Sequence, residues 1–399
     1  MSAARVFGRE VAEWRAGSRA ALGLPIDRPI VMTGHQAGIW HAGIAEKFLV
    51  GARIAAERGA ALVHLVVDHD LNDASLVAFP ALVDGRLARL ALERSPRAAV
   101  GTPNVLRRPV RTMRPERTHE VPPGVEAALA AVERAIAAQR DRSDLAMQMA
   151  HAANVLLAPR TRIDVTVAAT AIAALPIAEA MRGGFPPLRE AYNAAVAGER
   201  IAPLSPNELP FWKLDRTTSS RAALLEGDVA GLVAPRALAL TAIARLALCD
   251  LFIHGTGGGR YDLAMERWIG DALGAEARAS LAPTMVATAT RHAPIARFVP
   301  PFDAAATPEA LRTLEQDPFG DDGRTKRALR GAIAGSRVER RAAYLAMRRA
   351  IVEARAGREA EIASLRARIA ENREALAAHA LAMDRTWPFP LTSFADSDH

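Results

Sequence analysis

Two short apolar runs, separated by a glycine turn and a helical stretch, constrain the fold of this 399-residue chain most strongly. Residues 30–33 and 62–67 have the composition of buried strands. Between them, residues 42–58 place apolar side chains on one side of a predicted helix, and Gly59 follows where a glycine commonly ends one. A strand, a helix and a strand of these lengths predict a right-handed crossover between two parallel strands.

The same order recurs in the second half of the chain. Residues 251–253 form a third apolar run, a glycine-rich turn follows, residues 260–273 have a helical pattern, and residues 284–290 have the composition of a strand. Strands and helices that alternate in this way predict an α/β fold with a Rossmann-like parallel sheet.

The other segments are predicted to be mostly helical. Helices are expected at residues 1–24, 125–139, 144–157, 165–181, 188–197 and 235–248, and the four that fall within 123–200 form an inserted helical subdomain. Residues 209–214 are predicted as an edge strand, because Pro210 lacks the N–H that a central strand needs. The dipeptide Asp84-Gly85 predicts a hairpin turn.

Residues 336–384 are rich in charge and alanine and contain no proline. Ile362, Ile369, Leu376 and Met383 recur every seven residues, which predicts C-terminal coiled-coil helices and a homodimer formed through them, with a break at Gly357. An apolar segment at 387–391 is expected to dock on the core. The resulting division is 1–122 and 201–300 for the two halves of the α/β core, 123–200 for the insertion and 301–399 for the C-terminal helical region.

The charge balance bears on possible partners. Lysine and arginine total 51 against 44 acidic residues, a net charge of +7, but only three of the 51 are lysines. Abundant arginine and alanine together indicate a coding bias, and the arginines look dispersed among acids. Aromatic residues, which stack on bases, make up only 5%. We therefore expect a small anionic ligand as the partner and no nucleic acid.

The single cysteine, Cys249, excludes an internal disulfide and a multi-cysteine zinc site, and is expected to be a buried small apolar residue. No run of about 18 apolar residues predicts a transmembrane helix. The first 22 residues carry charges throughout, unlike a signal peptide. These features predict a cytoplasmic protein with no membrane partner.

The first candidate site is the turn that follows residues 30–33. Gly34 and Gly38 would let the backbone approach a ligand, His35 and Gln36 would be exposed at the strand end, and the next helix would offer free N–H groups to an anion. His41-Ala42-Gly43 resembles part of the His-x-Gly-His signature of class I nucleotidyl-transfer enzymes, with Ile44 in place of the last histidine. The alternative is a turn that only connects a strand to a helix.

The second candidate is Asp68-His69-Asp70, directly after the second strand. Carboxylates beside a histidine could orient it as a base, bind Mg²⁺ or hold a substrate amine. A solvated turn that caps the next element is the alternative, and it accounts well for Asn72 and Asp73. His64 lies within the strand and is expected to be a core histidine.

The third candidate runs from His254 to Tyr261. Glycines between a strand and a helix can form a concave row of N–H groups suited to phosphate or carboxylate, and Arg260 could pair with an anion. A flexible connection is the alternative. The binding residues expected here are His254, Gly255, Gly257, Gly258, Arg260 and Tyr261.

With these three turns, in this order, the chain resembles the bacillithiol biosynthesis cysteine-adding enzyme family. That family has a Thr/Ser-Gly-Gln-Gln-Ala-Gly turn, a Glu-Asp-His-Asp turn and a late Gly-Gly-Pro-Gly-Glu-x-x-Tyr turn. The present sequence departs from that pattern at His35, Val67, His254, Thr256 and Gly258. The likeness extends over about residues 30–290 and, more loosely, through the C-terminal helices.

The resemblance implies a nucleotide-binding core related to class I aminoacyl-tRNA synthetases and an activity that joins cysteine to an amino-sugar malate conjugate. We therefore expect a ligase-like enzyme that joins an amino acid to an amine-bearing small molecule, with ATP or ADP and Mg²⁺ as possible cofactors. The expected catalytic residues are His35, Gln36, His41, Asp68, His69 and Asp70.

Two alternatives stay open. The first is a metal-dependent hydrolase or transferase that uses the histidines and aspartates of the three turns, although no tight ligand motif assigns a metal site. The second is a non-enzymatic assembly module that dimerises through its C-terminal helices.

Overall fold

The structure, a computed structural model, describes residues 4–92, 101–110, 119–229 and 231–392. It divides into two units by internal contacts. Unit 1 comprises Met1–Leu82, Arg89–Pro294 and Asp384–His399, and unit 2 comprises Val83–Ala88 and Ile295–Met383.

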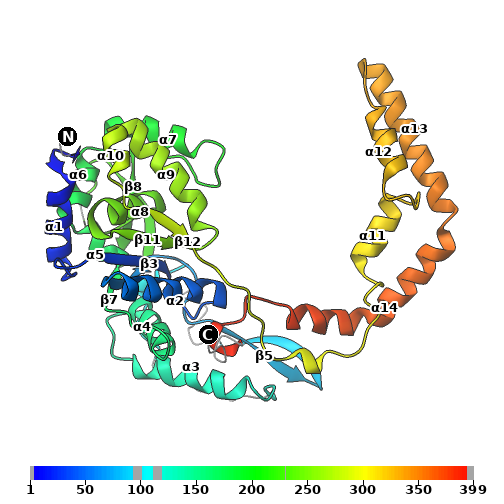
Figure 1. Ribbon diagram of the computed structural model, residues 1–399, viewed down its shortest axis with the longest axis horizontal. Coiled ribbons are helices and arrows are strands. Elements are labelled where there is room, and N and C mark those ends of the chain that lie inside the picture. Colours follow the sequence, from blue (N-terminus) through cyan, green and yellow to red (C-terminus); the bar gives the residue numbers. More distant parts are fainter. Residues whose placement is uncertain (1–3, 93–100, 111–118, 230, 393–399) are drawn as a thin grey trace. The chain divides into compact units, whose positions relative to one another are not determined.

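A five-stranded parallel sheet forms the centre of unit 1 (Figure 1). Its order is β12 (Thr284–Val286), β11 (Leu251–His254), β3 (Ile30–Gln36), β4 (Ala61–Val67) and β7 (Val165–Ala168). Helix α2 (Ala42–Glu57) connects β3 to β4, and α9 (Gly258–Leu273) and α10 (Ala275–Ala279) connect β11 to β12. Both predicted parallel crossovers, and the α/β class, are confirmed.

Alternation along the strands places apolar side chains on both faces of the sheet. Val31, Leu62 and Ile253 pack with Ile54 of α2 in a small cluster on one face. Met32 and Val63, one residue out of phase with the first two, belong to the main core on the other face. Burial on both faces explains why these strands are continuous apolar runs.

Three smaller sheets occur among the described residues, and the turn of the second, residues 83–88, belongs to unit 2. An antiparallel sheet has the order β10 (Leu232–Pro235), β8 (Glu208–Asp215) and β9 (Ser220–Leu225). Strands β5 (Val77–Val83) and β6 (Arg86–Leu92) form a hairpin with positive φ at Asp84 and Gly85, as the Asp-Gly dipeptide predicts. A two-residue pair, β1 (Arg5–Val6) and β2 (Arg9–Glu10), lies near the N-terminus.

The other α-helices of unit 1 surround these sheets. They are α1 (Val11–Ala21), α3 (Glu126–Ala138), α4 (Leu145–Leu157), α5 (Ala169–Ala173), α6 (Pro176–Gly183), α7 (Arg189–Val196) and α8 (Ala237–Ile243). A π-helical turn, Ala244–Leu248, continues α8 and leads to the buried Cys249, which confirms the prediction for that residue. Short 3-10 turns occur at Asn104–Leu106, Pro186–Leu188 and Phe389–Leu391.

Two helix predictions are wrong in part. The expected helix at 1–24 begins only at Val11, because the chain first forms the β1–β2 turn with positive φ at Phe7 and Gly8. The expected helix at 165–181 begins with strand β7, which pairs with β4, so part of the expected helical block belongs to the parallel sheet. Val165 and Val167 are β-branched and favour a strand, and the segment forms one because it can pair with the edge of β4.

The position of β8 in its sheet and the start of α8 also differ from expectation. Strand β8 is the central strand of its sheet and not an edge strand. Pro210 is accommodated because the β8–β9 register shifts between Glu208 and Trp212, an irregularity of the kind that tolerates proline. Pro235 ends β10 and does not start a helix, which begins at Ala237.

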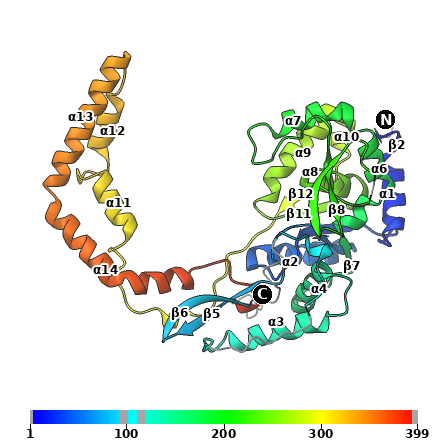
Figure 2. The same ribbon diagram turned by 180° about the vertical axis from the view of Figure 1, so that it is seen from behind.

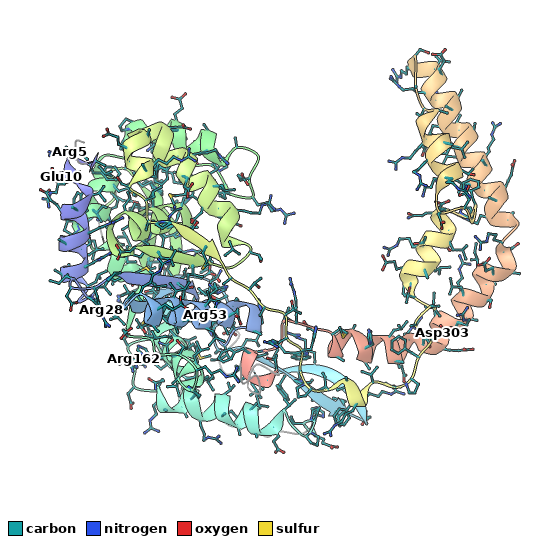
Figure 3. The ribbon with its side chains drawn as sticks, viewed as in Figure 1. Arg5, Glu10, Arg28, Arg53, Arg162 and Asp303 are labelled. Carbon is teal, nitrogen blue, oxygen red and sulfur yellow. The ribbon has the colours of Figure 1, made fainter. Side chains whose placement is uncertain are left out.

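Unit 2 contains four helices (Figure 2). They are α11 (Pro308–Gln316), α12 (Arg324–Gly331), α13 (Arg337–Ala356) and α14 (Glu359–Ala382), preceded by a 3-10 turn at Ala296–Phe298. The break at Gly357 is confirmed. In the predicted heptad, Ile362 is buried, Ile369 and Leu376 are partly buried and Met383 is exposed. Asp303, labelled in Figure 3, pairs with Arg368 of α14.

The segment 387–391 docks on unit 1 as predicted. Trp387, Phe389 and Leu391 are buried, and the Phe389 N–H donates to the Trp40 carbonyl at 2.6 Å. Among the described residues, no helix is both long enough and apolar enough to cross a membrane.

Candidate functional site

The three candidate turns emerge at one edge of the parallel sheet. Strand β3 lies between β4 and β11 and all three run in the same direction, so their carboxyl ends are neighbours. The register pairs Gln36 with Val67, and β3 and β4 therefore end level. Asn72 Nδ2 donates to the Ala37 carbonyl at 2.9 Å, which joins the second turn to the first. Carboxyl edges of this kind are where open α/β sheets bind ligands.

Lys47, on α2, lies between the first and third turns. The residue is only 2% exposed, and its Nζ donates to the Gly34 carbonyl at 2.6 Å. A Cβ built on Gly255 would lie 3.8 Å from Lys47 Cδ. Within the described part of the chain, no carboxylate pairs with this amine, and burial lowers its pKa from 10.5 to about 7. A bound anion would therefore supply the counter-charge that this buried amine lacks.

The imidazole of His35 lies near Lys47 and is neutral at physiological pH. Burial, and after it the charge on Lys47, lower the pKa of His35 to about 3. Its Nδ1 is buried and has no hydrogen-bond partner in the described residues. A neutral imidazole with a free ring nitrogen can donate to, or accept from, a ligand group.

His64 is a core histidine, as predicted. It lies within β4, its Nδ1 is 2.8 Å from Asn154 Oδ1, and its ring packs edge-on against Trp40 and Phe48. Burial lowers its pKa to about 3. The Trp40 and Phe48 rings stack with centroids 5.0 Å apart, so this aromatic cluster stiffens the turn that carries His35.

The glycines of the first turn have packing roles. A Cβ on Gly34 would lie 2.5 Å from the Leu65 carbonyl oxygen, so glycine lets β3 and β4 approach each other. Gly38 has a φ of +152°, a conformation that other residues rarely adopt. His41 caps α2, because its Nδ1 accepts from the Gly43 N–H at 3.1 Å, and burial lowers its pKa.

Asp68 supports the backbone. It is buried, and it accepts a hydrogen bond from the Thr170 N–H at 3.1 Å and another from the Thr170 hydroxyl. The carboxylate thus holds the first turn of α5 and ties the end of β4 to the end of β7. His69 is also buried, and its Nδ1 lies 3.6 Å from Asp68 Oδ1 with no hydrogen bond to a described residue.

Asp70 is paired with a cationic side chain of the antiparallel sheet. Arg221 of β9 lies 3.6 Å from Asp70 Oδ1 and donates to the His69 carbonyl at 3.0 Å. The Trp212 ring lies between two guanidiniums, with Arg221 at 4.4 Å and Arg236 at 3.9 Å from its centroid. Stacking on the ring fixes the orientation of both guanidiniums. The half-buried Asp70 is therefore held in place by its partner.

The third turn contains a buried ionic cluster. His254 Nε2 lies 2.6 Å from Asp262 Oδ2, and Arg245 donates to the same oxygen at 3.0 Å. Arg245 also donates to Glu266 at 2.7 Å. A Cβ on Gly258 would lie 2.5 Å from His254 Nδ1, so this glycine makes room for the imidazole. Asp262 thus orients His254 at the end of β11.

The remaining predicted residues of the third turn face outward. Arg260 and Tyr261 are exposed on the first turn of α9, and Gly257 has no neighbour within 4 Å of a built Cβ. Gly255 borders Lys47. The structure therefore brings His254 and Gly255 to the shared edge and leaves the next residues open to solvent.

Four residues near this edge were missed from the sequence: Lys47, Arg221, Arg236 and Asp262. One signal could have found Lys47, because it is one of only three lysines in a chain that otherwise uses arginine. The two arginines come from a distant part of the sequence, and only the pairing of β8 with β9 and β10 places them beside Trp212.

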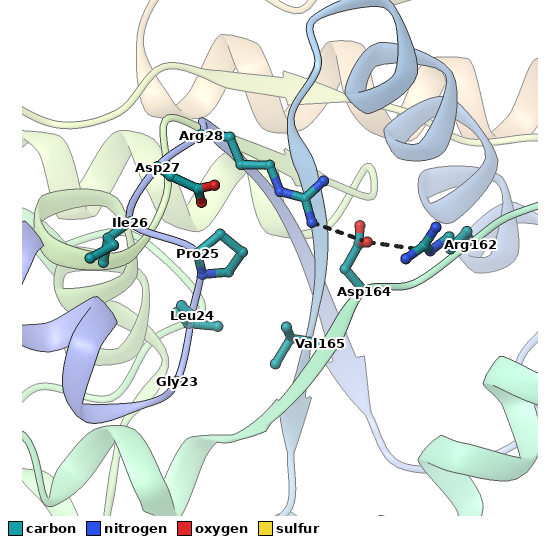
Figure 4. A pocket seen from close by; sticks show the side chains of 9 residues that line it. All are labelled: Gly23, Leu24, Pro25, Ile26, Asp27, Arg28, Arg162, Asp164 and Val165. Carbon is teal, nitrogen blue, oxygen red and sulfur yellow. Dashed lines mark hydrogen bonds and ion pairs between the residues drawn. The ribbon is translucent and has the colours of Figure 1, made fainter.

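Two surface pockets of unit 1 lie elsewhere. One, of about 580 Å³, is at the amino-terminal ends of β3 and β7, opposite to the candidate site (Figure 4). There Asp164 pairs with both Arg28 and Arg162. The other, of about 330 Å³, is lined by residues of α4 and the following loop, including His151 and Asn154. Neither contains a residue of the three turns.

Across the described ranges, no three His, Cys, Asp or Glu side chains are grouped as ligands of one metal ion would be. The sequence matches no protein-family model, and no curated protein shows significant similarity to it. The fold and the edge define an α/β protein with a candidate site at the carboxyl ends of a parallel sheet.

Proposed function

We propose that this protein is a ligase-like enzyme that binds a nucleotide and joins an amino acid to an amine-bearing small molecule. The resemblance to the cysteine-adding enzymes of bacillithiol biosynthesis supports the reaction class, with a core related to class I nucleotidyl-transfer enzymes and cysteine as a candidate donor. The Lys47 amine, buried between the first and third turns without a carboxylate partner among the described residues, is the observation that carries the proposal.

An anion at Lys47 would meet several donors. The amine supplies one, and the neutral imidazole of His35 and the side chain of Gln36 are on the adjoining strand end. In a desolvated position, a phosphate or carboxylate gains more from such donors than it would in water. His254, oriented by Asp262, borders the same edge from β11.

The second turn is suited to the amine substrate. Asp70 offers a half-buried carboxylate, which is a counter-charge for an ammonium group. The Nδ1 of His69 faces the Asp68 carboxylate at 3.6 Å, so its other ring nitrogen, Nε2, would accept the proton that the amine releases as the new C–N bond forms. The amino-acid carboxylate would first displace pyrophosphate from the α-phosphorus of ATP, or ADP from its γ-phosphorus. When the amine attacks the carboxyl carbon, the C–O bond breaks and the oxygen leaves with the phosphoryl group. Asp68 acts as a positioning residue through Thr170, and Mg²⁺, if required, would accompany the nucleotide.

Thermal unfolding with ligand tests the proposal. ATP or ADP at 1 mM, with and without Mg²⁺, is expected to raise the melting temperature, since a ligand at about 100 times its Kd stabilises by about 2.7 kcal/mol. Lys47→Met should abolish the increase. Lys213→Met, which removes a lysine that pairs with Asp228 away from the three turns, should leave it intact. No increase with any nucleotide would contradict the proposal.

Metal analysis of the purified protein tests the alternative of a metal-dependent hydrolase or transferase. Stoichiometric zinc or manganese, lost together with activity on chelation, would favour that alternative over the ligase.

A further inference from the structure

The positive charge of the chain is concentrated on two helices of unit 2. The segment 324–356, which contains α12 and α13, has ten basic residues and only two acidic ones, so its net charge is +8. The whole chain has a net charge of +7, so all other residues together carry −1. The sequence predicted no nucleic-acid partner because the arginines looked dispersed among acidic residues. That holds for the rest of the chain, but within 324–356 the basic residues are not balanced by acidic ones. The ten basic residues are Arg324, Lys326, Arg327, Arg330, Arg337, Arg340, Arg341, Arg348, Arg349 and Arg355.

The ten basic side chains are not neutralised by ion pairs with described residues. Within the described part of the chain, none of the ten forms an ion pair, and those that do form hydrogen bonds, such as Arg340 with the Gly335 carbonyl, meet backbone oxygens. Glu339 is engaged in the capping box of α13 with Ser336. The arginines of α14 differ, because Arg366 and Arg368 pair with acidic residues.

The outward face of α13 presents its arginines in a row. Arg341, Arg348 and Arg355 are exposed and recur every seven residues, so they lie on one side of the helix about 10 Å apart. The Arg355 guanidinium donates to the Glu315 carbonyl, whereas Arg341 and Arg348 form no hydrogen bond or ion pair among the described residues. Arg349 flanks this row. Guanidiniums bind phosphate oxygens in a bidentate manner, and a row of them matches a chain of phosphates.

We propose that α12 and α13 bind the phosphodiester backbone of a nucleic acid. The surface has the features of a sequence-independent site, in which cations displace counterions from the backbone. This inference does not depend on the proposed ligase reaction.

Two other partners fit less well. Val338, Leu345 and Val352 are 78%, 45% and 58% exposed and form one line along α13, and Tyr344 is 48% exposed. Tyr344 lies about 100° around the helix from that line, with Arg341 and Arg348 between, so these side chains do not form a continuous apolar face. Helix α12 has no exposed large apolar residue. A helix that enters a membrane surface needs an apolar arc of about 100° or more. A second copy of the chain would bring two surfaces of net charge +8 together, which like-charge repulsion opposes.

Fluorescence anisotropy with the full-length protein tests the proposal. The probes are a labelled 20-nucleotide single-stranded RNA, a 20-base-pair RNA duplex and a 20-base-pair DNA duplex, each titrated at 50, 100 and 200 mM KCl. We expect binding to at least one probe, with an affinity that falls steeply as salt rises. The comparison among the probes identifies which form of phosphodiester backbone is bound.

The variant Arg341→Gln/Arg348→Gln/Arg349→Gln should weaken binding at least about 10-fold at 100 mM KCl. For a duplex it should lower the slope of log affinity against log salt by about 3, because each lost phosphate contact removes about 0.9. The matched control, Arg53→Gln/Arg58→Gln/Arg134→Gln, removes three exposed arginines of unit 1 and should bind as the wild type does. Circular dichroism verifies that both variants keep their helices.

Three outcomes would overturn the proposal. They are no binding to any probe at 50 mM KCl, equal loss of affinity in the two triple variants, and binding to anionic phospholipid vesicles without binding to nucleic acid. The nucleotide-induced increase in melting temperature should persist in the α13 variant, so failure of this inference is distinguishable from failure of the ligase proposal.

Discussion

Replacing Lys47 by methionine should stabilise unit 1 at neutral pH. The side chains are similar in length, but methionine carries no charge that must be buried. The pKa of the lysine falls from 10.5 to about 7 on folding. At about 1.4 kcal/mol for each pH unit, burial of the charged amine opposes folding by about 5 kcal/mol. Loss of the hydrogen bond to the Gly34 carbonyl offsets about 1–3 kcal/mol of this gain. The variant should therefore be more stable by about 2–4 kcal/mol at pH 6–7.

The sign of the effect should depend on pH. Below pH 7 the amine is charged in both the folded and the unfolded chain, so the wild type bears the full cost of burial. Between pH 7 and 10.5 the folded protein holds a neutral amine while the unfolded chain still binds the proton, so wild-type stability rises with pH. The gain of Lys47→Met should thus shrink above pH 7, vanish near about pH 9 and reverse at higher pH.

Urea unfolding followed by tryptophan fluorescence measures this effect. All five tryptophans lie within unit 1, so the signal reports the unit that holds Lys47. The free energy of unfolding should be compared at pH 6, 7, 8 and 9, with Lys213→Met as the surface control, which should differ from wild type by no more than about 0.5 kcal/mol. A pH-independent difference, or a wild type that is more stable than Lys47→Met at pH 6, would refute the reasoning.

Three other predictions concern the same edge. ADP binding at pH 8 should take up close to one proton, because the anion recharges Lys47, and less at pH 6, where the amine is already charged. Calorimetry measures the uptake in two buffers of different ionisation enthalpy at each pH, Tris and HEPES at pH 8 and MES and bis-Tris at pH 6. Equal uptake at both pH values would argue against Lys47 as the partner. Gly34→Ala should destabilise unit 1 by about 2 kcal/mol or more, because its Cβ would lie 2.5 Å from the Leu65 carbonyl oxygen. In the control Gly255→Ala the nearest atom is 3.8 Å from the new Cβ, so this variant should keep the wild-type stability. Urea unfolding measures both. Asp68→Asn keeps the shape of the side chain but weakens its two hydrogen bonds from Thr170, so the free energy of unfolding should fall by about 1–2 kcal/mol. A stability equal to that of the wild type would show that the carboxylate does not stabilise the first turn of α5.

The candidate site could be predicted in part. His35, Gln36 and Asp70 were found because polar side chains directly follow apolar strands, and parallel strands expose their carboxyl ends at one edge. Asp68 was also found, but its contacts with Thr170 were not, because β7 was predicted as helix. The sequence shows that a carboxylate follows β4, but its partner, Thr170, becomes visible only when β7 is placed beside β4.

The sequence by itself determined the local elements and the two crossovers. The apolar runs around Val31 and Leu62, the amphipathic pattern of α2 and the Asp84-Gly85 turn depend on periodicity and backbone preference over a few residues, which are local properties. Tertiary structure decided the rest: that β7 joins the sheet, that β8 is central, and that the amine of Lys47 is buried without a carboxylate partner in the described part of the chain. Those outcomes depend on which segments, distant in the sequence, pack against each other and bury one another's surfaces. Such packing is a property of the whole folded chain and not of any short stretch of it.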